Sequence, residues 1–150
     1  MDSAEMFDPT SNTWVCLPKM KEKRVGVCCA IFEDKLYAMG GWHGTSRLTS
    51  VEYLDLNDMS KGWSDAPPMN VGRCNFGAHC VRDQDGPKLV VCGGYTTSIH
   101  SQSSTERSEY FDGFHWFPTS NNLARPMVGF SMTSVNMTTS LRDSILDGMM

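Results

Sequence analysis

The residues best able to do chemistry, histidine and cysteine, are scattered along this 150-residue chain. Their spacing matches no metal site, and the chain lacks the G-x-S-x-G, H-E-x-x-H, phosphate-loop and dinucleotide-binding motifs. We therefore predict that the chain is not an enzyme and holds no cofactor or metal. The residues concerned are His43, His79, His100, His115, Cys16, Cys28, Cys29, Cys74, Cys80 and Cys92.

The cysteines form no C-x-x-C pair, and most lie in apolar, strand-like segments. Free cysteine in such a segment behaves as a small buried hydrophobe, so we expect reduced, structural thiols. The alternative is a redox-sensing role for Cys16 or Cys74, which adjoin predicted loops; it would require an exposed thiol with a lowered pKa.

Charge and hydropathy exclude several classes of partner. The net charge is −4 and no basic cluster extends beyond residues 19–24, which argues against nucleic acid or an anionic membrane as the main partner. The first residues lack the pattern of a signal peptide, and the longest mostly apolar stretch, residues 25–32, is too short to span a bilayer. We expect a cytoplasmic protein.

The positions that organise the chain are two glycine pairs. The apolar run Leu36–Met39 ends in Gly40 and Gly41, and the run Leu89–Cys92 ends in Gly93 and Gly94. A run of four apolar residues suits a buried strand, and glycines at its end allow positive φ or close backbone approach. An aromatic residue follows each pair, Trp42 and Tyr95.

Other markers repeat at the same interval of about 50 residues, which is typical of repeat architectures. Three copies of a Glu-x-apolar-Asp segment begin at Glu5, Glu52 and Glu109, and a tryptophan follows each copy. A proline-marked turn then precedes a glycine-led apolar strand. The pattern therefore predicts four short strands in each unit and almost no helix. This is an all-β fold. The remaining markers are Tyr53, Tyr110, Trp14, Trp63 and Trp116.

These markers resemble the kelch repeat. The resemblance implies a β-propeller, in which each repeat forms one blade of four antiparallel strands. It divides the chain into the outer strands of a partial blade (1–24), two complete repeats (25–73 and 74–126), and a last part (127–150). This last part holds the first strand of a further blade, residues 129–135, and a divergent tail. One position departs from the family pattern: Arg73 and Arg125 stand four residues before Gly77 and Gly129, whereas Glu22 precedes Gly26. The first entry loop is therefore expected to carry mixed charge, which argues against a purely basic pocket.

About three blades are too few to close a ring, since propellers have about 4–8. We expect a fragment or truncated form of a longer kelch protein. The alternatives are a dimer that completes the ring, with self-association through open blade edges, or a strand order that closes only within a longer parent.

The resemblance also implies a binding face made by the loops after the glycine pairs and the loops that enter each first strand. Aromatic and arginine side chains commonly dominate interfaces. The alternative is that Trp42 and Tyr95 pack only against their own loops. The candidate partner-binding residues are Trp42, His43, Arg47, Arg73, Asn75, Tyr95, Ile99 and His100.

The function that the resemblance implies is protein binding, most like the substrate-recruiting propeller of BTB–kelch adaptors for cullin-RING ubiquitin ligases. Cullin itself would be contacted by BTB and BACK regions, which these 150 residues do not contain. A second possibility is actin binding. A third, from a different class, is a kelch-propeller enzyme such as an oxidase or a sugar epimerase.

Overall fold

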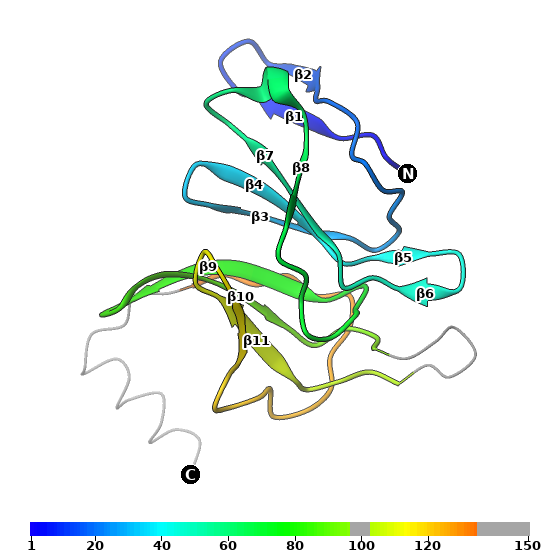
Figure 1. The fold of residues 1–150 in the computed structure, drawn as a ribbon, viewed down its shortest axis with the longest axis vertical. Helices are drawn as coiled ribbons and strands as arrows, with labels where there is room; N and C mark the ends of the chain where they lie inside the picture. Colours follow the sequence, from blue (N-terminus) through cyan, green and yellow to red (C-terminus); the bar gives the residue numbers. More distant parts are fainter. Residues whose placement is uncertain (97–102, 135–150) are drawn as a thin grey trace.

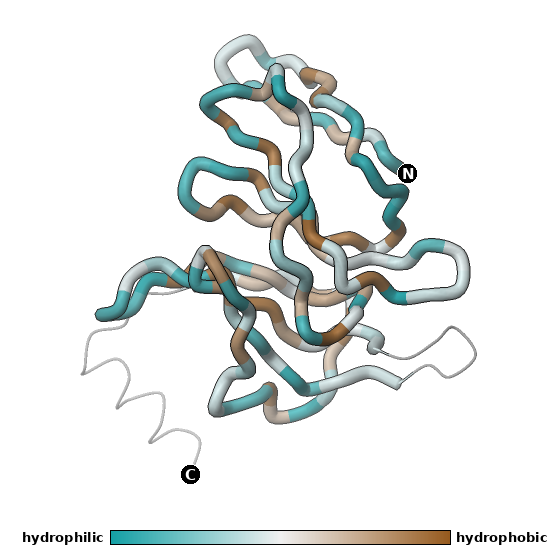
Figure 2. The backbone as a smooth tube through the Cα atoms, viewed as in Figure 1, coloured by the Kyte–Doolittle hydropathy of each residue, from teal (hydrophilic) through white to brown (hydrophobic). Residues whose placement is uncertain are grey.

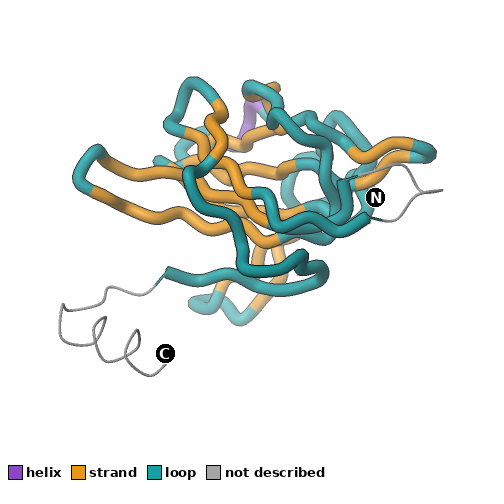
Figure 3. Tube along the Cα trace, turned by 90° about the horizontal axis from the view of Figure 1, so that it is seen from below, coloured by secondary structure: helices purple, strands orange, loops and turns teal. Residues whose placement is uncertain are grey.

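The structure, a computed structural model, describes residues 1–96 and 103–134. It is built from short antiparallel strands, and the only helical turn among these residues is the 3-10 turn η1 (Met59–Lys61) (Figures 1 and 3). The strands are β1 (Glu5–Asp8), β2 (Thr13–Cys16), β3 (Cys28–Phe32), β4 (Lys35–Met39), β5 (Trp42–His43), β6 (Ser46–Arg47), β7 (Val51–Asp55), β8 (Ser64–Ala66), β9 (Gly77–Asp83), β10 (Gly86–Cys92), β11 (Ser108–Phe111) and β12 (Trp116–Pro118).

Two four-stranded sheets account for most of the strands. The first blade has the order β3-β4-β7-β8 and the second has the order β9-β10-β11-β12, with every neighbouring pair antiparallel. β1 and β2 form a separate hairpin. This is the predicted architecture of kelch blades in an incomplete propeller. The blades lie within the predicted repeats 25–73 and 74–126, whose boundaries stay a prediction.

Apolar side chains fill the spaces between neighbouring units, and Figure 2 shows polar segments at the turns that join the strands. One buried cluster, which includes Phe32, Tyr37 and Phe111, lies between the two blades. A second cluster, which includes Leu54 and Trp63, joins Leu17 and Met20, in the segment after β2, to the first blade. Large aromatic side chains contribute most of the area buried at such contacts.

Each blade also bonds to the preceding unit through its tryptophan. The indole Nε1 of Trp63 donates to the carbonyl of Pro18 at 2.7 Å, and Trp116 donates to the carbonyl of Pro67 at 2.9 Å. The equivalent Trp14 is 67% exposed. The described part of the chain thus places a unit against the tryptophan faces of both blades and none against the face of the N-terminal hairpin.

The predicted strand at residues 129–135 does not form in the described residues: 129–134 contain no strand, and Val135 lies outside them. Residues 127–132 nevertheless follow the path that the second blade takes beside the first. Gly94 N–H donates to the carbonyl of Met127 at 2.8 Å, just as Gly41 N–H donates to that of Arg73. A first strand normally pairs with a second, as β9 does with β10, and no described residue offers such a partner here.

Candidate functional site

The loops that follow the two glycine pairs are anchored in the same way. Trp42 exchanges two backbone hydrogen bonds with Val25, at 2.7 and 3.0 Å, and Tyr95 exchanges two with Cys74, at 3.0 and 3.2 Å. Each loop is therefore fixed to the segment that enters the first strand of its own blade. Trp42 and Tyr95 occupy equivalent positions at the same end of neighbouring blades.

The two loops also touch each other. The Arg47 guanidinium carbon lies 5.5 Å from the centre of the Tyr95 ring, a distance at which the cation is attracted to the face of the ring. The contact joins the β5–β6 hairpin of the first blade to the segment after β10 (Figure 1). Arg47 and Trp42 carry buried nitrogens, Nε and Nη1 of Arg47 and Nε1 of Trp42, that form no hydrogen bond within the described structure. We call this surface, made of Trp42, His43, Arg47, Asn75 and Tyr95, the loop face.

The other predicted partner-binding residues differ in their exposure. His43 and Asn75 are exposed, and Asn75 adopts a φ of 52° while its backbone bonds to Gly26 and Gly129. Arg73, expected among the partner-contacting residues, is instead fully buried, because its guanidinium donates to the backbone and to Glu109 of the second blade. Ile99 and His100 lie outside the described residues.

Buried arginine–glutamate pairs tie the entry loop of each blade to its third strand. Arg24 Nη2 lies 2.9 Å from Glu52 Oε1, and Arg73 Nη2 lies 3.0 Å from Glu109 Oε1. Both arginines also donate from Nη1 to two backbone carbonyls. A buried charge needs such a partner, and each arginine and glutamate provides it for the other.

The predicted departure at Glu22 is wrong, because the arginine of the first blade is Arg24. The corresponding position in each unit lies two residues before a residue with positive φ. These residues are Gly26, Asn75 and Gly129, with φ of 63°, 52° and 63°. On this alignment the third equivalent of Arg24 is Met127, and Arg125 is an exposed side chain. The first entry loop therefore keeps its arginine and adds Glu22 beside it.

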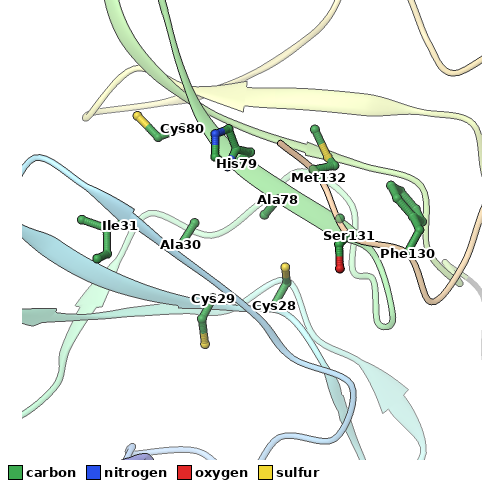
Figure 4. Close-up of a pocket in the computed structure, with 11 residues that line it drawn as sticks. Cys28, Cys29, Ala30, Ile31, Ala78, His79, Cys80, Phe130, Ser131 and Met132 are labelled. Carbon is green, nitrogen blue, oxygen red and sulfur yellow. The ribbon is translucent and has the colours of Figure 1, made fainter. Parts of the chain in front are cut away.

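A cavity of about 440 Å³ lies between β3, β9 and residues 130–132 (Figure 4). Cys28, Cys29 and Cys80 line it, together with His79, whose Nε2 lies 3.0 Å from Ser134 Oγ. Burial raises the pKa of Cys28 to about 11, with a smaller contribution from Cys29. A thiol with that pKa is protonated at neutral pH, which makes it a poor nucleophile and metal ligand.

Burial also raises the pKa of Tyr37 to about 12. Both groups should make the unfolding free energy fall at alkaline pH, because above about pH 9 the unfolded chain releases protons that the folded chain retains. The contribution of Cys28 is complete below pH 9 and is lost as pH rises through about 11. It amounts to about 3 kcal/mol, because each of the two pKa units is worth about 1.4 kcal/mol. Urea unfolding at pH 8 to 11 measures it, and Cys28→Ala should flatten that part of the curve. An equal decline in the variant would contradict the assignment.

Within residues 1–96 and 103–134, no group of three or more His, Cys, Asp or Glu side chains is arranged to hold a metal ion. A search of the same residues finds no helix with the length and hydropathy to cross a membrane. The loop face offers a contact surface of aromatic and guanidinium groups.

Comparison with known proteins agrees with the structure. A family model described as the kelch motif matches residues 1–21 and 23–70. The chain is 32% identical over 98 residues to kelch repeat and BTB domain-containing protein 2 of cowpox virus (strain GRI-90 / Grishak), a match that covers 62% of this chain and 16% of that protein. It is 33% identical over 72 residues to human Kelch-like protein 4, covering 48% and 10%.

A third relative, the kelch repeat-containing protein kel-10 of Caenorhabditis elegans, is 32% identical over 115 residues, covering 72% of this chain and 18% of the relative. The chain thus spans less than a fifth of the length of these relatives. The structural features that recur in these repeats are the tryptophan hydrogen bonds, the glycine pairs and the arginine–glutamate pairs. This chain is built from kelch repeats like those of the Kelch-like proteins and the kelch-repeat proteins with BTB domains.

Proposed function

We propose that this chain is a non-catalytic protein-binding module and that its partner contacts the loop face. The observation that carries the proposal is the contact between Arg47 and Tyr95, which joins two equivalent loops of neighbouring blades into one surface. Arginine and tyrosine are enriched among the residues that dominate binding energy. Half-buried side chains of this kind lose little conformational freedom when a partner covers them.

The names of the relatives support a finer proposal. Two of the matched proteins have names that pair kelch repeats with a BTB domain. We propose that the loop face holds a substrate for a cullin-RING ubiquitin ligase, in the cytoplasm, and that cullin is reached through BTB and BACK sequence beyond these 150 residues. Actin, or a second copy of the chain bound to the exposed face around Trp14, is the alternative protein partner.

The test is to identify proteins that the immobilised chain retains from a cytosolic extract and to compare them with those retained by Arg47→Ala/Tyr95→Ala. We expect the double variant to retain at least tenfold less of each specific partner, because two central contacts are lost. Arg82→Ala is the matched control, since Arg82 is exposed on β9 of the second blade. Undiminished retention by the double variant would overturn the proposal, and metal-dependent turnover of a sugar by the purified chain would favour the enzyme class instead.

A further inference from the structure

The two arginine–glutamate pairs allow a position-by-position comparison of the blades. Arg24 Nη1 donates to the carbonyls of Gly40 and Ser50, and Arg73 Nη1 donates to those of Gly93 and Arg107. Arg107 is therefore the counterpart of Ser50. Counting back two residues from each arginine makes Val71 the counterpart of Glu22.

In the first blade a carboxylate occupies the space beside the buried arginine. Glu22 Oε2 lies 3.3 Å from Arg24 Nη2, and the Ser50 hydroxyl donates to the same oxygen. His43 Nδ1 is 3.8 Å from the other oxygen. Glu22 thus fills this space and adds a second negative charge next to the pair of Arg24 and Glu52.

In the second blade the same place is an open cavity of about 370 Å³. Val71 supplies no carboxylate, and Arg107 brings a positive charge where the first blade has a hydroxyl. The set Arg24, Glu52 and Glu22 has a formal charge of −1, whereas Arg73, Glu109 and Arg107 have +1. The residues that line the cavity include Arg73, Arg107, Ser108, Trp116, Thr119 and Asn122.

Two groups at the cavity are left with unused hydrogen-bond donors. Arg107 is exposed and forms no ion pair within the described residues. Arg73 is fully buried, and its Nε–H has no hydrogen-bond partner in the described structure. Arg73 already pairs with Glu109, so the guanidinium that an opposite charge in the cavity would pair with is that of Arg107.

We propose that this cavity binds a carboxylate from an acidic side chain of a protein partner, which takes the place that Glu22 fills in the first blade. Arg107 contacts the carboxylate, with the Asn122 side-chain amide beside it, and the buried Arg73 supplies positive charge beneath. The inference rests on the proposed function, because it gives the chemistry that a partner of this module would present. It adds a site that lies beside the third and fourth strands of the second blade.

The charge balance favours a carboxylate over a phosphate. Glu109 lies in the wall of the cavity and holds its second oxygen toward Asn70, which donates from both its backbone and its side chain. One net positive charge neutralises a singly charged carboxylate. A phosphate monoester carries about −1.5 to −2 at neutral pH and would be repelled by Glu109.

The probe is a peptide of five glutamates with blocked ends, titrated into the ¹⁵N-labelled full chain. We expect saturable shifts of the Ser108 and Thr119 amides and of the Trp116 indole N–H, and none with the five-glutamine peptide. Arg107→Gln should weaken the binding about tenfold or more, as expected for loss of a charged hydrogen bond. Val71→Glu should abolish it by restoring an internal carboxylate, and Arg82→Gln should leave it unchanged.

Equal binding of the glutamine peptide, or unchanged binding by Val71→Glu and Arg107→Gln, would overturn the proposal. Stronger binding of a phosphoserine peptide would overturn the assignment of a carboxylate. Arg107 is exposed, so its variant tests the site even if Val71→Glu fails to fold. One outcome separates the two proposals: a partner that is lost with Arg47→Ala/Tyr95→Ala but retained with Arg107→Gln. It would support partner binding by the loop face and show that the cavity takes no part in it.

Discussion

Replacing Arg73 with methionine is expected to lower the free energy of unfolding by about 3–5 kcal/mol, because it leaves Glu109 as an unpaired buried charge. Glu109 is 2% exposed and Arg73 is not exposed at all. The same substitution removes the donors to the carbonyls of Gly93 and Arg107. Urea unfolding followed by circular dichroism measures the loss.

The matched control is Arg125→Met, since Arg125 is an exposed arginine of the same chain and its replacement should change stability by less than about 0.5 kcal/mol. The double variant Arg73→Met/Glu109→Met should recover part of the loss, because it removes the unpaired charge as well as its partner. An Arg73→Met variant as stable as Arg125→Met would show that the pair does not stabilise the second blade.

Replacing Gly40 with alanine is expected to cost about 2 kcal/mol or more, by the cost of a strained backbone position together with a steric clash. Gly40 has a φ of 58°, and a Cβ there would lie 2.5 Å from the carbonyl oxygen of Arg73. That oxygen accepts the backbone hydrogen bond from Gly41 at 2.8 Å. The substitution therefore pushes apart the two backbones at the contact between the blades.

Gly44→Ala separates the cost of the strained backbone from the cost of the steric clash. Gly44 has a similar φ of 66° in the turn between β5 and β6, but a Cβ there would meet no atom within 4 Å. It should lose only the conformational term, about 1–2 kcal/mol. The difference between the two unfolding free energies then measures the close approach. Equal losses would mean that the glycine pair serves local backbone conformation and not the packing of blades.

The sequence was sufficient to predict the two four-stranded blades because the markers of this fold are local. A glycine pair after four apolar residues, a tryptophan after Glu-x-apolar-Asp and a proline-marked turn each lie within one unit. Their counterparts in space, such as Trp63 on Pro18 and Trp116 on Pro67, follow from the repeat. The expectation that the glycine pairs allow close backbone approach is confirmed at Gly40 and Gly41.

The errors came from alignment within the entry loops. Residue type alone aligns Gly26 with Gly77, whereas the structural counterpart of Gly26 is Asn75. Asparagine is among the residues other than glycine that most readily adopt positive φ. A search for an arginine two residues before either Gly or Asn would have found Arg24. The burial of Arg73 could not be read from the sequence, because exposure depends on how neighbouring blades pack.

The contact between Arg47 and Tyr95 and the cavity beside Val71 were also beyond prediction. Both depend on the distance between loops of different blades, which no local pattern encodes. The arginine–glutamate pairs show which residues of the two blades correspond, and they make Val71 the counterpart of Glu22. The repeats in the sequence thus predict the two blades. The candidate site depends on residues that differ between the repeats.

The most direct test of the loop face is site-specific photo-crosslinking, with one photoreactive residue placed at position 47, 95, 34 or 85. Positions 34 and 85 lie in the β3–β4 and β9–β10 turns, at the end of the blades opposite the β5–β6 hairpin (Figures 1 and 3). We predict that positions 47 and 95 yield the same partner adduct and that positions 34 and 85 yield none. An adduct formed equally or better from positions 34 and 85 would contradict the proposal that the partner binds the loop face.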